Sequence, residues 1–130
     1  MKATTLIGLI AIISSSAMIT GCGSILKSLV GYHNVNSVDL ARECMTDSAL
    51  VVVRQGKDHH SALTLSHGSV LEVLYLQELG REEEARGLYS NAVKKSPFLR
   101  NTKQLEREVK KARKDLARDR KRRGHDAECR

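Results

Sequence analysis

The chain has 130 residues, of which 41% are hydrophobic and 28% charged, and this length and composition favour a single folded domain. Aromatic residues make up only 3% and Trp is absent, which argues against aromatic platforms for nucleic-acid bases or sugars. One Pro and nine Gly suit helices better than a many-turned sheet. The formal charge is +7, and residues 103–123 carry all of it, because they hold eleven Lys and Arg but four Asp and Glu.

The first residues follow the order of an export signal. Lys2 and the chain amine give a positive start, and residues 6–13 form an apolar run. This run is too short for a spanning helix, which needs about twenty apolar residues. The sequence Ile19-Thr20-Gly21-Cys22 then resembles the lipobox of bacterial lipoproteins. The resemblance implies that residues 1–21 are a cleaved signal peptide and that Cys22 is acylated.

Acylation at Cys22 would hold the protein on a membrane, because two or three acyl chains bind a bilayer durably. In bacterial lipoproteins an Asp after this Cys retains the protein in the inner membrane, and here Gly23 follows instead. The resemblance therefore implies a lipid anchor in the bacterial outer membrane, with the protein facing the periplasm. The alternative is an ordinary secretory signal in which Cys22 happens to lie near the cleavage point.

Export also bears on the two other cysteines, Cys44 and Cys129. The periplasm is oxidising, so a disulfide between them is permitted and would connect the first helix to the C-terminal region. The alternative is that Cys44 is a small buried side chain and Cys129 a terminal thiol. The sequence leaves both possibilities open.

The region after the signal is predicted to be all-α. Residues 22–36 are a lipidated tether for which we predict no regular structure, residues 37–100 form a helical domain, and residues 101–130 form a basic C-terminal helix and tail. Apolar residues at three- and four-residue spacing predict helices over 38–55, 69–79, 82–95 and 101–116.

Three further details belong to these predictions. Residues 57–68 are ambiguous and can be the first half of a longer helix. Asn101 followed by Gln104 resembles a capping box at the start of the last helix. Residues 117–130 have almost nothing to bury, so we expect them to project into solvent or fray.

Residues 69–97 resemble the second half of a tetratricopeptide repeat. The matching positions are Gly80, Ala85, Tyr89, Ala92 and Pro97. The resemblance implies a helical hairpin in which Gly turns the chain, Ala lets the helices approach and the aromatic fills the gap. A lone repeat cannot bury its own face, so the flanking helices must cover it in a small bundle or short solenoid. A plain helical hairpin with similar turn chemistry is the alternative.

No motif for catalysis is present, so we do not expect an enzyme, and we expect no cofactor. The Gly-rich stretch is confined to the processing site, and no nucleophile turn occurs. His59, His60 and His67 are candidate metal ligands. No further Cys, His or carboxylate pair stands at a spacing that would complete a known metal site. We therefore predict no metal site.

The basic segment is the remaining candidate site. We expect it to contact an anionic partner through a set of its basic residues: Lys110, Lys111, Lys114, Arg118, Arg120, Lys121, Arg122 and Arg123. An exported protein does not normally meet nucleic acid, so lipid phosphates, peptidoglycan carboxylates and acidic protein surfaces are the available anions. The alternative is a merely solvated helix with ion pairs such as Glu106–Lys110 and Asp119–Arg123.

These observations lead to two hypotheses for function. The first is an outer-membrane lipoprotein that acts as a docking module for an envelope protein. The small tetratricopeptide lipoproteins that the chain resembles include pilotins and adaptors of peptidoglycan enzymes. The alternative is a structural envelope lipoprotein whose basic tail binds peptidoglycan or lipid phosphates. A third hypothesis is an enzyme accessory or metal-binding protein that uses the His cluster.

Overall fold

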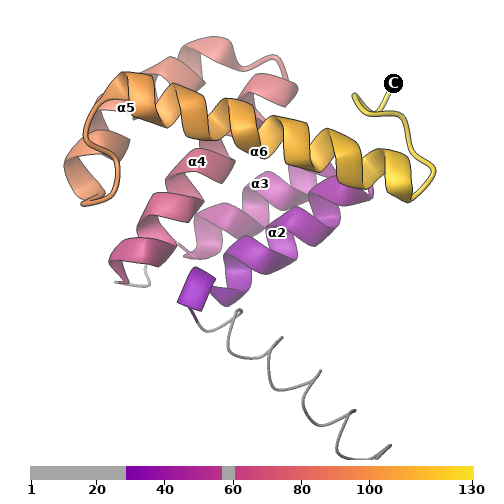
Figure 1. The fold of residues 1–130 in the computed structure, drawn as a ribbon, viewed down its shortest axis with the longest axis horizontal. Helices are drawn as coiled ribbons and strands as arrows, with labels where there is room; N and C mark the ends of the chain where they lie inside the picture. Colours follow the sequence, from indigo (N-terminus) through magenta and orange to yellow (C-terminus); the bar gives the residue numbers. More distant parts are fainter. Residues whose placement is uncertain (1–28, 57–60) are drawn as a thin grey trace, which may run out of the picture.

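The computed structural model describes residues 29–56 and 61–130, and within these ranges the protein is helical without strands. The helices are α2 (Tyr32–Arg42), α3 (Thr46–Gln55), α4 (Ala62–Glu78), α5 (Glu82–Lys95) and α6 (Thr102–Arg122) (Figure 1). The predicted all-α fold is confirmed. The predicted signal peptide, Cys22, His59 and His60 lie outside the described residues.

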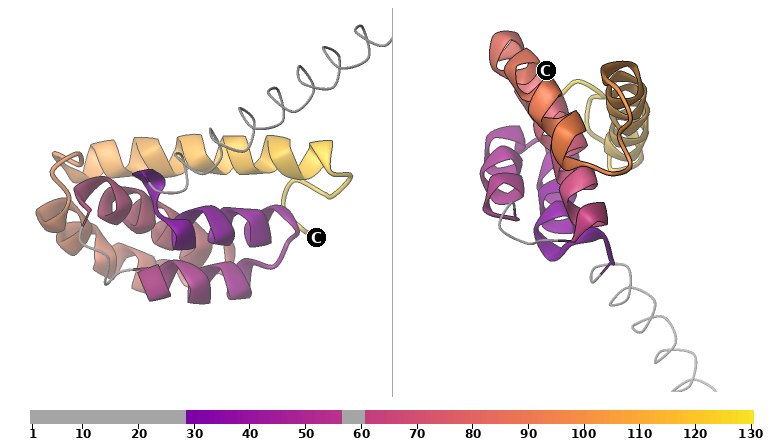
Figure 2. Two further views of the ribbon diagram at one scale, coloured as in Figure 1. Left: turned by 90° about the horizontal axis from the view of Figure 1, so that it is seen from below. Right: turned by 90° about the vertical axis from the view of Figure 1, so that its left-hand side faces the viewer.

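The helix α4 is the centre of the bundle and contacts each of the other four helices. Its residues Val73, Leu74, Tyr75 and Leu76 are all buried, so neighbours cover the helix on every side. The buried Tyr75 hydroxyl shares a hydrogen bond of 3.1 Å with the Ser37 hydroxyl of α2, and burial raises the pKa of Tyr75 to about 12. Helix α2, which also contacts α4, lies between α6 and α3 (Figure 2).

The single helix predicted over residues 38–55 is wrong, because the chain turns at Glu43–Met45 and forms two helices. Cys44 has a φ of 60°, and the N–H of Met45 donates to the carbonyl of Leu40 at 3.0 Å. This is how a helix usually ends at a left-handed Gly. The spacing of apolar residues concealed the break because the residues on both sides of the turn face the same core.

Helix α2 begins earlier than predicted, since residues 32–36, assigned to the tether, form its start. Gly31 precedes it with a φ of 97°. A Cβ on Gly31 would lie 2.6 Å from Cγ2 of Thr64, so a residue without a side chain is needed where α2 passes α4. The tether prediction is therefore wrong for these residues.

Helices α4 and α5 form the helical hairpin that was predicted for residues 69–97. From Ala62 onward the ambiguous stretch belongs to α4, which continues without a break past Gly68. Gly80 makes the turn with a φ of 73°. Ala85 and Ala92 of α5 are buried, which allows the backbones of the two helices to approach closely.

The prediction that residues 117–130 project or fray is wrong. Helix α6 continues to Arg122, and the chain then folds back toward the turn between α2 and α3. Both His125 and Arg123 bond to the carboxylate of Glu43, and these two bonds lower the pKa of that carboxyl. The segment is held by polar contacts, which a search for apolar spacing does not detect.

Arg120 is the principal polar contact of this region, although it is 1% exposed. Its Nε donates to the carbonyl of Ala41 in α2 at 2.8 Å. Its Nη1 and Nη2 donate to the two carboxylate oxygens of Glu78 in α4 at 3.0 and 2.9 Å, and Nη1 also donates to the carbonyl of Ala127 at 3.1 Å. One guanidinium group therefore connects α6, α2, α4 and the C-terminal segment.

A disulfide joins Cys44 to Cys129, with a Cα–Cα distance of 5.5 Å and a separation of 85 residues along the chain. Of the two possibilities that the sequence left open, the structure contains the bridge. It attaches the C-terminal segment to the turn between α2 and α3, beside the Glu43 contacts.

We predict that Arg120→Met strongly destabilises the protein, because it leaves the Glu78 carboxylate without its buried partner. The free energy of unfolding, measured by denaturant titration, should fall by about 3–5 kcal/mol. The control is Arg118→Met in the same helix, which breaks an exposed pair with Asp115 and should cost less than about 1 kcal/mol. Equal losses in the two variants would contradict a central role for Arg120.

We also predict that the disulfide contributes about 4.5 kcal/mol to the free energy of unfolding, as the chain-entropy relation gives for a loop of this length. The double variant Cys44→Ser/Cys129→Ser should be less stable by that amount in denaturant titrations. Reducing agent should lower the stability of the wild type to the same level and leave the double variant unchanged. A wild type that is insensitive to complete reduction would rule the contribution out.

Candidate functional site

The candidate site lies on α6, and its position depends on how this helix is anchored. At the start, Asn101 Oδ1 accepts a hydrogen bond from the N–H of Gln104 at 2.9 Å, as the capping prediction requires. The Gln104 side chain differs slightly from the prediction, because its Oε1 accepts from the N–H of Arg100. Leu105, Val109 and Leu116 are buried and define the inner face of the helix.

The outer face of α6 carries a continuous row of positive charges, which we call the cationic stripe. Its members follow one another at three- and four-residue steps, so they share one side of the helix. All of them are exposed. The stripe consists of Lys103, Arg107, Lys110, Lys114, Arg118 and Lys121. At 1.5 Å per residue it is about 27 Å long.

Most of this charge is not neutralised within the protein. Arg118 pairs with Asp115 at 2.7 Å, whereas the five other members form no ion pair with any residue in the described ranges. The small side chain of Ala117 leaves a shallow depression bordered by Lys114, Arg118, Lys121 and Arg122. An anionic group placed there would meet four cations.

The ion pairs that the alternative predicted do not form among the described residues. Asp119 pairs with Arg42 of α2 at 2.9 Å, and Arg123 pairs with Glu43. Asp119 and Glu43 therefore attach the end of α6 to α2 and to the residue that follows it.

The structure divides the eight predicted contact residues into four groups, of which the last is Arg120 alone. Lys110, Lys114, Arg118 and Lys121 lie on the stripe, and Lys111 and Arg122 are exposed beside it. Arg123 is exposed but holds Glu43.

Arg120 was predicted as a contact residue, and this is wrong: its side chain is buried on Glu78 and the Ala41 carbonyl. It cannot reach a partner without breaking the core.

Two residues of the stripe, Lys103 and Arg107, were missed by the sequence prediction. They lie at the start of α6 and continue the same three- and four-residue spacing. The sequence could have identified them if the basic residues had been sorted by helical spacing, on the face opposite the apolar residues, rather than by the local density of charge.

A groove runs along the flank of α6, between it, α2 and α4, with a volume of about 350 Å³. Its apolar lining includes Val35, Val38, Val70, Leu71 and Ala112. Charged side chains also line it: Arg42, Glu108, Lys111 and Asp115. Lys111 lines the groove and also stands beside the cationic stripe. The groove and the stripe therefore share an edge and form one continuous surface.

The histidines do not form a metal site within the described residues. His67 is exposed on α4, and no group of three potential ligands occurs in the part of the chain that the structure describes.

None of the described helices is long and apolar enough to cross a membrane. Compared with models of known protein families, with curated proteins and with solved structures, the chain matches none of them.

Proposed function

We propose that the protein is a bacterial outer-membrane lipoprotein, anchored through Cys22 and facing the periplasm, whose helical body is a docking module for an acidic protein of an envelope assembly. The observation that carries the proposal is the cationic stripe, with five of its six charges unpaired among the described residues. The signal-like N-terminus and its lipobox support the location.

The length of chain between Cys22 and the helical body limits how far the body can lie from the membrane. The chain between Cys22 and Leu29, where the described residues begin, spans at most about 25 Å even when fully extended. An acylated Cys22 therefore keeps the stripe close to the bilayer, where it meets other membrane-attached proteins at high local concentration.

The apolar groove favours a protein as the partner. Lipid phosphates and peptidoglycan carboxylates need only positive charge, whereas a protein can place apolar side chains in the groove and acidic ones on the stripe. The alternative, a structural lipoprotein that binds peptidoglycan or lipid phosphates, uses the stripe alone. High salt separates the two, because it screens exposed charges but leaves apolar contacts intact.

We predict that the triple variant Lys110→Glu/Lys114→Glu/Lys121→Glu loses its partner. Reversing three charges on one face places like charges opposite an acidic surface, which costs several kcal/mol and weakens binding at least about 100-fold. The measurement is crosslinking in intact cells, followed by identification of the captured proteins. The variant should keep its fold, because all three residues are exposed.

The matched control reverses three exposed cations outside α6: Arg86→Glu, Lys94→Glu and Arg100→Glu. It should retain the partner. If both triple variants lose it equally, the effect comes from net charge and the stripe is not the site. A bound fraction that consists only of cell wall or lipid, and that disappears at high salt, would favour the structural alternative.

We further predict that Cys22→Ser releases the protein from the membrane. The wild type should incorporate labelled palmitate and fractionate with the outer membrane, and the variant should do neither. The disulfide between Cys44 and Cys129 leaves the body's fold independent of Cys22. A wild type that takes up no label would overturn the lipid anchor.

A further inference from the structure

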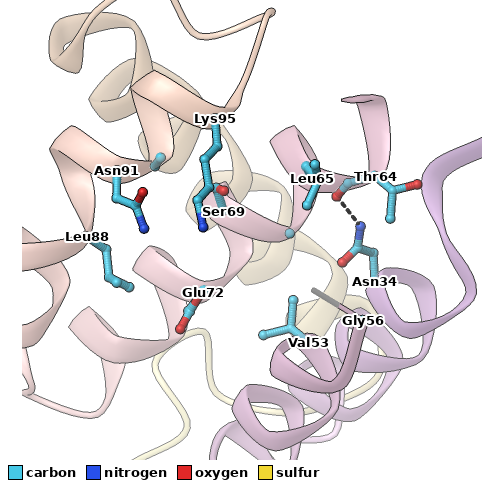
Figure 3. A pocket seen from close by; sticks show the side chains of 12 residues that line it. Asn34, Val53, Gly56, Thr64, Leu65, Ser69, Glu72, Leu88, Asn91 and Lys95 are labelled. Carbon is cyan, nitrogen blue, oxygen red and sulfur yellow. Dashed lines mark hydrogen bonds between the residues drawn. The ribbon is translucent and has the colours of Figure 1, made fainter. Parts of the chain in front are cut away.

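A second cavity lies away from α6, where the start of α2, the end of α3, the first half of α4 and the second half of α5 meet. Its volume is about 80 Å³ (Figure 3). Val53, Leu65, Leu88 and Ala92 form apolar walls, while Asn34, Ser69, Glu72, Asn91 and Lys95 add polar groups. We call this cavity the amide cleft, after Asn34.

Asn34 is 2% exposed, and hydrogen bonds fix its amide group. Its Nδ2 donates to the carbonyls of Val30 and Thr64 at 2.8 and 2.9 Å, which uses both of its hydrogens. Its Oδ1 accepts no hydrogen bond from any described residue and is directed into the cleft in Figure 3. An acceptor held in this way at the wall of a cleft, in a residue that is otherwise buried, is suited to a ligand that donates an N–H group.

Gly68 leaves the space in front of this oxygen open. A Cβ added to Gly68 would lie 3.2 Å from Asn34 Oδ1. Gly in the middle of a helix costs about 1 kcal/mol relative to Ala. The structure accepts that cost at a position of α4 where a side chain would lie against Asn34 Oδ1.

The charged groups of the cleft have opposite signs and come from different helices. Glu72 of α4 is 3% exposed, and its Oε1 accepts from Arg54 Nε at 2.9 Å. This bond to Glu72 is the main reason that the pKa of Arg54 is raised. Lys95 of α5 extends toward the cleft in Figure 3 and forms no ion pair with any described residue.

We propose that the amide cleft binds a small α-amino acid in its zwitterionic form. The ammonium group donates to Asn34 Oδ1, and the carboxylate accepts from Lys95 and Asn91 at the α5 side of the cleft. Both charges of the ligand then meet a charge of opposite sign or a hydrogen-bond partner, so neither is buried alone.

The size of the cleft agrees with this class of ligand. Each water-sized group needs about 10–15 Å³ of such space, so 80 Å³ holds about five to eight of them. Glycine, alanine and serine fall within this range. The apolar walls provide room for a methyl or hydroxymethyl side chain but not for an aromatic one.

Calorimetric titration of the purified full chain with glycine, L-alanine and L-serine tests the proposal. Binding should be measurable up to about 10 mM ligand, a concentration that saturates a site with a millimolar dissociation constant. Acetate and methylammonium, which each carry one half of the zwitterion, should bind at least about tenfold more weakly. The absence of binding by all three amino acids would overturn the proposal, as would equal binding of acetate alone.

Two variants locate the binding in the cleft. Lys95→Met should raise the dissociation constant about tenfold, because it removes a charge-assisted hydrogen bond. Lys94→Met, the neighbouring exposed cation that does not line the cleft, should leave it unchanged. Equal effects of these two variants would place the binding elsewhere.

In Gly68→Ala the gain of about 1 kcal/mol in helix propensity offsets the tight 3.2 Å contact with Asn34 Oδ1, so the variant should remain folded, which circular dichroism checks. Its methyl group would stand in front of Asn34 Oδ1 and should abolish binding. Unchanged affinity in this folded variant would show that the amide oxygen is not the ligand's partner. None of these measurements depends on the lipid anchor or on the cationic stripe.

Discussion

The fold depends on one buried ion pair, that of Arg120 with Glu78, because helices from both halves of the chain meet at it. A guanidinium group that has lost its water needs hydrogen-bond acceptors for its N–H groups and a negative charge nearby. Here the partners come from α2, α4 and the C-terminal segment, so these parts can hold the charge only when they are all in place. The same contact fixes the rotation of α6, and thereby turns the cationic stripe outward.

Apolar spacing predicted the parts of the fold that are held by apolar contacts. It located α4, α5 and the start of α6, and it indicated correctly that α4 is surrounded by neighbours. It failed at Glu43–Met45, where the turn interrupts the helix but not the apolar face. It also failed beyond Leu116, where a buried arginine and a disulfide replace apolar side chains.

The candidate site shows the same limit. Charge density identified α6, and helical spacing would have added Lys103 and Arg107. Charge density did not distinguish Arg120 from its exposed neighbours, although its position four residues after Leu116 continues the inner face of the helix. Its partner could not be predicted, because Glu78 lies on another helix. The amide cleft could not be predicted at all, since Asn34, Glu72 and Lys95 are far apart in the sequence and lack a shared motif.

The unpaired charge of α6 also affects how copies of the protein meet. Two molecules that approach with these faces together repel each other, and the repulsion extends over about 10 Å at 0.1 M salt. Self-association through this face is therefore disfavoured, so the exposed cations of α6 remain accessible when the protein is concentrated.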